Sequence, residues 1–525
     1  MYWCKIARTD KEFDEIAKLN YETFVEEIPQ HRPNEKKRLI DRFHSENTYL
    51  LVYKGTEMVG MLAFRDQRPF SLDEKIGNVE LLLEKEVCHK LCEIRLLAVK
   101  KEFRNGRVFR QLAKGIYSYV YDRGYTAAVI SGITKEKKLY NQLGFQQFTE
   151  EVGTEDAKFL PMVLTRKNGS KMSERIRLTQ HTFFPGPVEQ EQALTHTGTS
   201  HRSSEFFSLN YEMREKLLEL SNAKHVTTLV GTGTLANDVM LGQMKADFKE
   251  TKGLMISNGE FGERLLRQAK KWHLNFDICS YKWGEEFNLF EIEQNLWTGN
   301  YHWICFVHGE TSTGICNDFE PILKLAKKYN VKVCADCISS FGSFSFSMEQ
   351  LHIATAVSGK SLGAMSGLAF IFTNGKPQKN DAPLYINLTH YFNNPLPFTI
   401  PAFLVANTLL ALKEYPKRFE LLQTRMEQIL NSPFSQYSIV QTSTYPMIVS
   451  MKLPLELEHF SDDAKLNGLL LHDESMYLKK YRLTQISTVS LNFEIAFEQL
   501  NAFYKTYLQI ISTGITIPSE VNAEV

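Results

Sequence analysis

Three short motifs between residues 231 and 363 hold side chains that could act on an amine or a carbonyl group. The first is Lys360 in SGKSLG (358–363), which follows the apolar stretch ATAVSG. Burial at a strand end lowers the pKa of a lysine, so its amine can form a Schiff base and later move a proton. By itself a loop lysine is more often a solvated charge, so the other two motifs must support this interpretation.

The other two motifs are a carboxylate and a glycine-rich turn. Asp336 ends the apolar stretch VKVCADC, where a carboxylate is costly unless it is paired. It could hold a protonated pyridine nitrogen, or it could cap a loop. The turn GTGT (231–234) lies between HVTTLV and an expected helix. Free N–H groups at a helix start can hold a phosphate, although a plain strand-to-helix turn is the alternative. Together, these three features meet the needs of pyridoxal 5′-phosphate (PLP).

A regular alternation of strands and helices must position these motifs. From 181 to 374 the chain alternates short apolar stretches, among them HVTTLV, GLMISN, WICFVHGE and LAFIFT, with helical segments. This pattern predicts an α/β fold with a mostly parallel sheet. A long helical stretch, 401–430, and a mixed segment follow. We expect a large domain at 181–400, a smaller α+β domain at 401–512 and a frayed tail at 513–525.

The first 168 residues form a separate predicted domain of mixed α/β type. A hairpin is expected at 47–64, a strand at 92–100, a helix at 108–123, then the strand TAAVIS and a last helix ending near Gly144. The polar stretch RKNGSKMSER has no periodicity, so we expect a linker at 169–180.

Composition restricts the partners and the compartment. Lys+Arg and Asp+Glu are both 61, so the net charge of zero argues against nucleic acid or an acidic membrane surface. The N-terminus lacks the apolar region of a signal peptide, and the longest apolar run, 400–412, is too short to cross a bilayer. We expect a cytoplasmic protein. Cys88 with Cys92 and Cys334 with Cys337 lack a second pair at a zinc-site distance, so we expect core or strand cysteines and no metal.

The ordered motifs resemble one enzyme family. HGETSTG (308–314), VKVCADCISSFG and SGKSLG, read in order, resemble the class V aminotransferases of PLP fold type I, in particular the alanine–glyoxylate and 2-aminoethylphosphonate–pyruvate branch. Further matches are FFPGPVEQ (183–190), SHRSSEF (200–206), NGEFGER (258–264) and PFTIPAF (397–403). The resemblance covers about 180–510. It implies a PLP-dependent aminotransferase that acts on an amino donor and a 2-oxo acid.

The resemblance also implies a role for each matching position. Thr232, Gly233 and Thr234 would hold the cofactor phosphate, and Phe261 would stack on the ring. Thr313 would reach the ring-hydroxyl side and Asp336 the ring nitrogen. Lys360 would form the covalent link. Thr399 matches a residue that reaches the phosphate of a neighbouring subunit, which implies a homodimer with its active site at the interface. Arg482 stands where the family binds the substrate carboxylate, but Thr484 and Ser487 replace the glycines expected after it. The substrate therefore stays open.

The same family also includes cysteine desulfurases and other PLP lyases, which are alternatives to an aminotransferase. Cysteine desulfurases carry their nucleophilic cysteine downstream of the lysine, and no cysteine follows Cys337 here. Desulfuration by that mechanism is excluded. Other PLP lyase reactions remain an alternative.

Residues 92–145 resemble the cofactor-binding core of the GNAT acyltransferases. The strand CEIRLLAV, which includes Val99, would pair along the pantetheine arm of acetyl-CoA or another acyl-CoA. Arg104 and Gly106 would lie at the pyrophosphate turn, although Arg107 and Phe109 occupy the family's small-residue positions. By role, Glu93 would be the general base, or else a solvent-facing strand residue. Tyr140 in LYNQLGF would be the general acid, or else a packing residue.

The sequence thus leaves three functional hypotheses. The first is a bifunctional enzyme in which the aminotransferase is joined to an acyltransferase that acylates an amine. The second is a single-activity PLP transaminase or lyase whose GNAT-like domain only binds acyl-CoA or mediates assembly. The third is a PLP-binding regulator, which ranks last because the chain lacks a DNA-reading element and a basic patch. The amino donor, the acceptor and the acyl chain are not specified.

Overall fold

A computed structural model describes residues 1–154, 157–168, 180–190, 194–394, 396–440 and 445–514. It forms two compact units. Unit 1 comprises Met1–Gln180, Glu456–Leu470 and Glu498–Val525, and unit 2 comprises His181–Leu455 and Leu471–Phe497. The expected linker lies outside the described residues except for Gln180. The expected tail does too, apart from 513–514, which end a helix.

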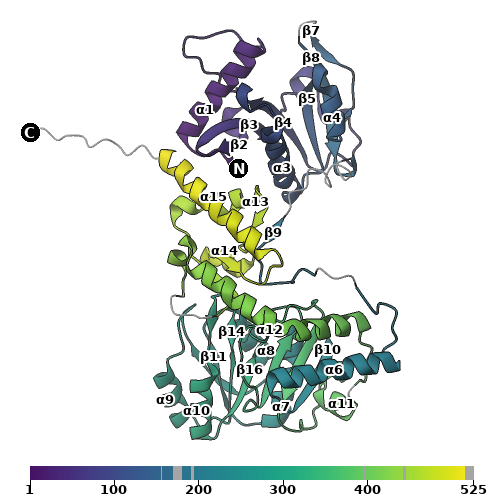
Figure 1. The fold of residues 1–525 in the computed structure, drawn as a ribbon, viewed down its shortest axis with the longest axis vertical. Coiled ribbons are helices and arrows are strands. Elements are labelled where there is room, and N and C mark those ends of the chain that lie inside the picture. Colours follow the sequence, from purple (N-terminus) through teal and green to yellow (C-terminus); the bar gives the residue numbers. More distant parts are fainter. Residues whose placement is uncertain (155–156, 169–179, 191–193, 395, 441–444, 515–525) are drawn as a thin grey trace, which may run out of the picture. The chain divides into compact units, whose positions relative to one another are not determined.

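Unit 2 is built on a seven-stranded sheet of order β10-β18-β17-β16-β13-β11-β12 (Figure 1). The strands are β10 (His225–Val230), β11 (Gly253–Ser257), β12 (Phe276–Ser280), β13 (Trp303–Val307), β16 (Lys332–Asp336), β17 (Ile353–Val357) and β18 (Leu368–Thr373). Only β18 runs antiparallel to its neighbours. The predicted mostly parallel sheet is confirmed. The edge strand β12 was not predicted, because FDICS is not an unbroken apolar stretch.

Helices cover both faces of this sheet because successive side chains of its strands point to opposite sides. Leu254 and Ile256 of β11 join one apolar core, whereas Met255 joins the other. The helices of unit 2 are α6 (Ser204–Ser221), α7 (Gly233–Phe248), α8 (Glu260–Lys271), α9 (Leu289–Thr298), α10 (Phe319–Tyr329), α11 (Leu388–Asn393), α12 (Ala402–Leu430) and α14 (Met476–Tyr481). Short strand pairs β14–β15 (Gly309–Glu310, Ile315–Cys316) and β19–β21 (Ile448–Met451, Thr484–Ser487) complete it.

Unit 1 is a mixed α/β fold around an eight-stranded sheet of order β1-β2-β3-β4-β5-β8-β6, with β7 beside β8. Its strands are β1 (Tyr2–Ile6), β2 (Thr48–Lys54), β3 (Glu57–Arg65), β4 (Leu91–Val99), β5 (Ala127–Ile133), β6 (Gln146–Gln147), β7 (Val152–Thr154) and β8 (Ala157–Thr165). Its helices in this region include α1 (Asp10–Tyr21), α3 (Arg107–Asp122) and α4 (Lys137–Gln142). The predicted hairpin, third strand and following helix are present.

The parallel strands β4 and β5 pair over only three residues. Their register runs from Leu91 opposite Ala127 to Glu93 opposite Val129. Beyond Glu93 the strand β4 continues to Val99, and it bulges where Leu96 adopts a φ of 53°. The backbone of β4 from residue 94 onward is therefore not hydrogen-bonded to β5. Such an unpaired stretch could receive an extended ligand along its N–H and C=O groups.

Segments from the C-terminal end of the chain complete unit 1. Asp463 on α13 (Phe460–Lys465) accepts hydrogen bonds from Arg8 over 2.6 Å and from Tyr507 over 3.1 Å. Asn467 binds both the N–H and the C=O of Cys4, each over 2.8 Å. Tyr507 lies in α15 (Phe493–Gly514). The region that the sequence suggests as one small domain, 401–512, is therefore divided between the two units.

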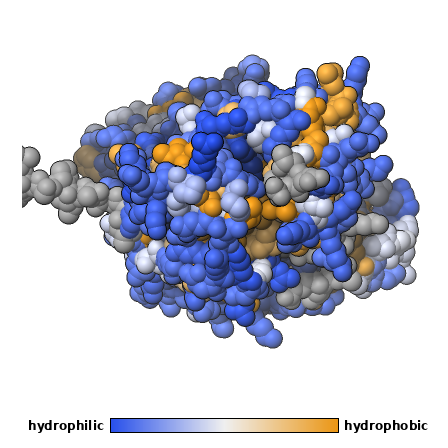
Figure 2. Space-filling view, turned by 90° about the horizontal axis from the view of Figure 1, so that it is seen from above, coloured by the Kyte–Doolittle hydropathy of each residue, from blue (hydrophilic) through white to orange (hydrophobic). Residues whose placement is uncertain are grey.

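Two surface properties complete the description. Among the described helices, none combines the length and the apolar character needed to cross a membrane. The face in Figure 2 is mainly hydrophilic and carries small, separate apolar patches.

Candidate functional site

The main candidate site lies at the carboxyl edge of the sheet in unit 2. Asp336 is the last residue of β16, and Lys360 comes three residues after the end of β17. The GTGT turn follows β10, which runs parallel to both. The carboxyl ends of parallel strands meet at one edge, where ligands bind in open α/β sheets. The fold thus brings the three motifs to the same edge.

Lys360 is surrounded by protein atoms, although solvent can still reach part of its side chain. Desolvation and, to a lesser extent, the positive charge of Arg264 lower its pKa to about 8, against the opposing effect of Asp336. Gly186 lies so close that a Cβ there would meet the carbonyl oxygen of Gly359 at 2.9 Å. The amine of Lys360 is therefore still mainly protonated at neutral pH, but it loses its proton far more readily than an ordinary lysine does.

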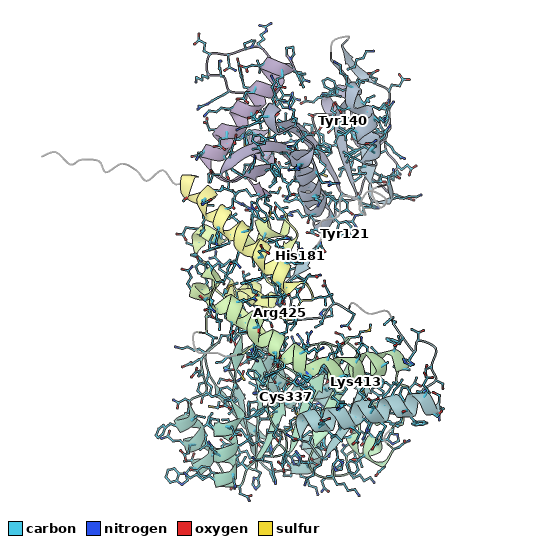
Figure 3. All side chains as sticks on the ribbon, viewed as in Figure 1. Tyr121, Tyr140, His181, Cys337, Lys413 and Arg425 are labelled. Atoms are coloured by element: carbon cyan, nitrogen blue, oxygen red, sulfur yellow. The ribbon has the colours of Figure 1, made fainter. Side chains whose placement is uncertain are left out.

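Asp336 is buried, and its carboxylate is held from two sides. The side-chain amide of Asn237 donates to Oδ2 over 2.7 Å, and the N–H of Ile338 donates to Oδ1 over 2.9 Å. Thr355 donates to the amide oxygen of Asn237 over 2.9 Å. Desolvation nevertheless raises the pKa of Asp336. A further positive partner would offset the free-energy cost of burying this carboxylate in its charged form. Directly after it comes the buried Cys337 (Figure 3).

The GTGT turn leads into the N-terminus of α7, which has no side-chain cap. Thr232 is the N-cap residue, yet its hydroxyl accepts no capping hydrogen bond. A Cβ at Gly233 would meet the side chain of Ile338 at 2.7 Å, so a larger residue there would have to displace Ile338. Thr232 and Thr234 are exposed. This is the open helix start, lined with hydroxyls, that an anion requires.

The start of α8 is held by a buried carboxylate that sequence reasoning missed. Glu310 accepts hydrogen bonds from the N–H groups of Phe261 (3.3 Å) and Gly262 (2.9 Å) and from the hydroxyl of Ser312 (2.5 Å). Burial raises the pKa of Glu310 to about 7. Phe261 is half-buried, 6.1 Å from the ring of Tyr477. Thr313 is buried and donates to the carbonyl of Glu310 over 3.3 Å.

Two residues singled out in the sequence lie in more exposed positions. Thr399 is exposed, with its hydroxyl 3.5 Å from Nε2 of His201. Arg482 is exposed at the C-cap of α14, with a φ of 55°. Thr484 and Ser487, which stand where the family has glycines, are both buried. Gln485, between Thr484 and Ser487, donates to the carbonyl of Thr311 over 2.6 Å and contacts His472 over 2.8 Å.

A second candidate site lies in unit 1, where β4 and β5 separate. Glu93 is fully buried, so it is not a solvent-facing residue. Its carboxylate accepts from the N–H of Ser71 (2.8 Å), the hydroxyl of Ser71 (2.6 Å) and the N–H of Leu72 (3.0 Å). Tyr140 on α4 lies with its hydroxyl 3.5 Å from the N–H of Ile133, at the end of β5 (Figure 3). Desolvation raises the pKa of Tyr140.

The turn before α3 is only partly available to a ligand. Arg104 donates to the carbonyl of Val99 over 2.8 Å and forms an ion pair with Glu27 at 2.8 Å. Gly106 is exposed, with a φ of 82°, and it directly precedes α3. Arg107 and Arg110 are exposed in the first turn of that helix. Arg107 and Arg110 thus present exposed charges at this turn, whereas Arg104, although exposed, is engaged by the protein.

Comparison with known proteins finds a family match in each of two regions of the chain. Residues 187–387 match the family described as aminotransferase class V, and residues 15–168 match the family described as N-acyl amino acid synthase FeeM. The chain thus joins a region similar to class V aminotransferases, called the aminotransferase region below, to a region similar to the FeeM family, called the FeeM-type region. The aminotransferase region contains Lys360, Asp336 and the GTGT turn, and the FeeM-type region contains Glu93 and Tyr140.

The aminotransferase region is similar to 2-aminoethylphosphonate–pyruvate transaminases. That of Bacillus mycoides (strain KBAB4) is 29% identical over 177 residues, covering 32% of this chain and 48% of the relative. That of Bacillus cereus (strain ATCC 10987 / NRS 248) is 25% identical over 301 residues, covering 51% of this chain and 81% of the relative. The chain thus spans about half the length of the first relative.

Solved structures share the fold of the aminotransferase region. An aspartate aminotransferase from Thermus thermophilus superimposes with a TM-score of 0.56 at 20% identity, covering 62% of this chain and 98% of that one. An alanine–glyoxylate aminotransferase from Nostoc sp. gives 0.54 at 18%, with 63% and 95% covered. The predicted fold type I architecture is confirmed. At these identities the likeness supports the fold and not the substrate.

The residues present fit pyridoxal 5′-phosphate. Lys360 has a depressed pKa, Asp336 is a buried carboxylate with an elevated pKa, and α7 begins without a cap. An aldehyde, a pyridine nitrogen and a phosphate on one ligand would meet these three groups. The fit depends on the side chains of the structure and not only on the motifs.

Proposed function

We propose that this chain is a bifunctional enzyme. Unit 2 exchanges an amino group between an amino acid or amine and a 2-oxo acid with pyridoxal 5′-phosphate. Unit 1 acylates an amine from acetyl-CoA or another acyl-CoA through a GNAT-like fold. The description of the FeeM family as N-acyl amino acid synthases suggests an amino acid as the acyl acceptor. The observation that carries the proposal is the pairing of a pKa-depressed Lys360 with a buried Asp336 at one sheet edge.

Each residue of unit 2 has a stated task in this proposal. Lys360 is the attachment point of the cofactor and afterwards the group that holds and moves the proton at the substrate carbon. Asp336 keeps the ring nitrogen protonated, and Asn237 fixes the orientation of the Asp336 carboxylate. The start of α7, with Thr232, Gly233 and Thr234, binds the phosphate, and Phe261 lies against the ring. When bound, the cofactor supplies an electron sink for the substrate carbanion.

Three further tasks follow from the family resemblance. Thr313 lies at the ring-hydroxyl side, and Arg482 binds the substrate carboxylate. Thr399 contacts the phosphate in a neighbouring subunit, so the working form is a homodimer in the cytoplasm. The exposure of Thr399 supports this, because a residue that serves a second subunit must lie at the surface.

In unit 1 the acyl donor would extend along the unpaired edge of β4, from Ile94 to Val99. Arg104, Gly106 and the N-terminus of α3 would lie at the pyrophosphate. Tyr140, whose raised pKa keeps its hydroxyl protonated, would return a proton to the leaving thiolate. Glu93 would accept a proton from the attacking amine.

One observation favours a second candidate function, in which unit 1 binds the acyl donor without transferring it. The carboxylate of Glu93 already accepts three hydrogen bonds from Ser71 and Leu72, so both of its oxygens are engaged by the protein and not by a substrate amine. The full-length chain should be assayed for release of free CoA with amino acids as acceptors, beside Tyr140→Phe. Acetyl-CoA binding without turnover would favour the second candidate. Turnover that falls in Tyr140→Phe would establish the first.

A further inference from the structure

Arg264 is a cation near the candidate site that lacks an anionic partner. It lies on α8, three residues after Phe261, and its guanidinium carbon is 5.0 Å from the centre of that ring. Its side chain is half-buried. Within the described part of the chain, the guanidinium has no hydrogen bond and no ion pair. A half-buried guanidinium with all of its donors free is an unusual arrangement, since arginine is normally paired when it is withdrawn from water.

Three other arginines of unit 2 have partners, unlike Arg264 and the half-buried Arg214 of α6, which also has no hydrogen bond or ion pair within the described residues. Arg267, one turn further along α8, forms an ion pair with Glu260 at 2.7 Å. Arg418 donates to the carbonyl of Ser361 over 2.9 Å. Arg425 forms an ion pair with Glu494 at 2.7 Å. The free donors of Arg264 therefore do not reflect a general lack of acceptors in this unit.

The charge of Arg264 acts on the catalytic candidates. It is among the causes that lower the pKa of Lys360 and that oppose the rise in the pKa of Asp336. It also acts on Tyr477, whose ring is 6.1 Å from that of Phe261. The charge of Arg264 thus reaches both Lys360 and Asp336. One turn beyond it, Gln268 donates to the carbonyl of Thr234 over 3.0 Å, so this face of α8 also borders the start of α7.

We propose that Arg264 is a receptor for an oxyanion of the ligand bound at Lys360. The guanidinium fork fits a group with two neighbouring anionic oxygens, and both a substrate carboxylate and the cofactor phosphate offer such a pair. This inference rests on the proposed function of unit 2 and adds a binding residue to it. Arg482 is exposed at the C-cap of α14, whereas Arg264 is half-buried and its charge acts on Lys360.

Binding of an oxyanion has a consequence for the lysine. The positive charge of Arg264 disfavours the protonated form of Lys360, because two like charges repel. An oxyanion on Arg264 compensates that charge. The pKa of Lys360 then rises, so the amine gains affinity for a proton when the ligand is in place. Arg264 would in this way couple ligand binding to the proton that Lys360 must hold.

The test compares Arg264→Leu and Arg264→Lys with Arg267→Leu, which removes an exposed arginine from the same helix and serves as the matched control. In one arm, full-length apoprotein is titrated with pyridoxal 5′-phosphate and with pyridoxal, which lacks the phosphate, and binding is followed by absorbance. In the other arm, the holoprotein is titrated with pyruvate and with methyl pyruvate, which lacks the carboxylate, and binding is followed by the change in the cofactor spectrum.

The inference predicts that Arg264→Leu loses affinity about tenfold or more in one arm, with partial recovery in Arg264→Lys and no change in Arg267→Leu. Loss restricted to pyridoxal 5′-phosphate assigns the phosphate, and loss restricted to pyruvate assigns the carboxylate. If the wild type binds both ligands and Arg264→Leu matches it within about twofold in both arms, the inference is wrong. If the wild type itself takes up no cofactor, the proposed function fails instead.

Discussion

The side-chain amide of Asn237 donates a hydrogen bond to Oδ2 of Asp336 over 2.7 Å, and both residues are buried. Thr355 holds the other end of that amide by donating to its oxygen. The carboxylate proposed to face the ring nitrogen is thus oriented by a chain of two polar side chains, from α7 and β17. Such a chain rigidifies a buried charge when every member is satisfied.

Replacement of Asn237 should weaken the cofactor site. Asn237→Ala removes one donor from a buried carboxylate, and a hydrogen bond to a charged group contributes about 1.5–3 kcal/mol. We expect the affinity of the apoprotein for pyridoxal 5′-phosphate to fall about tenfold or more, with a smaller loss in Thr355→Val. Titration followed by absorbance measures both. Unchanged affinity in a correctly folded Asn237→Ala would show that Asp336 needs no orienting partner.

The depressed pKa of Lys360 predicts how cofactor uptake depends on pH. Below about pH 8 the amine is mainly protonated and cannot attack an aldehyde, whereas above that pH it is mainly neutral. The rate of reconstitution of apoprotein with pyridoxal 5′-phosphate should therefore rise about tenfold for each pH unit below 8 and level off above it. Stopped-flow absorbance measures this profile. A rate that keeps rising towards pH 10, as for an ordinary lysine, would contradict the burial of Lys360 in this site.

Glu310 predicts a pH dependence of stability. Its pKa is raised from 4.5 to about 7 in the folded state, so the folded protein binds more protons than the unfolded chain between these values. This contribution is complete below about pH 4.5 and is lost as the pH rises through 7, with an upper limit of about 3 kcal/mol. Hydrogen exchange at the start of α8 should therefore be slower at pH 5 than at pH 8, after correction for the intrinsic rates. Glu310→Gln, which stays neutral, should remove that difference, and its persistence would mean that another group is responsible.

The contacts of Asp463 predict that the stability of unit 1 depends on the C-terminal part of the chain. Asp463→Ala leaves the guanidinium of Arg8 without its carboxylate, and removal of one partner of a buried pair costs on the order of 3 kcal/mol. Hydrogen exchange resolved by peptide should show faster exchange in β1 and at residues 498–514. Asp462→Ala, at the exposed neighbouring position, is the control.

The same contacts make a prediction for a truncated chain. Residues 1–168 alone lack Asp463 and Asn467, so Cys4 and Arg8 lose their partners. This fragment should unfold at a lower temperature than unit 1 in the full chain, as circular dichroism can show. A fragment as stable as the full-length unit would mean that the C-terminal segments contribute little.

The sequence was most informative where function depends on residues close together in the chain. The GTGT turn, Asp336 and SGKSLG each follow an apolar strand, so strand ends and their chemistry could be predicted together. Glu310 belongs to HGETSTG, but its contact with the start of α8 joins residues 48 and 49 positions apart and left no local signal.

The rest depends on longer-range contacts. Asn237 reaches Asp336 across 99 residues, and Asn467 reaches Cys4 across 463. No periodicity or composition indicates such pairs, which is why the division of 401–512 between two units was not predicted. The exposure of Arg482 and the free guanidinium of Arg264 likewise depend on packing that a single sequence does not reveal.

The most direct test of the central claim is the absorbance spectrum of the purified full-length protein with pyridoxal 5′-phosphate, beside Lys360→Ala. We predict a visible cofactor band that bleaches with an amino donor, returns with a 2-oxo acid and is missing in Lys360→Ala. A band that persists in Lys360→Ala, or no band at all with the cofactor supplied, would contradict the assignment of Lys360. A band that no amino donor bleaches would keep the cofactor site but refute transamination.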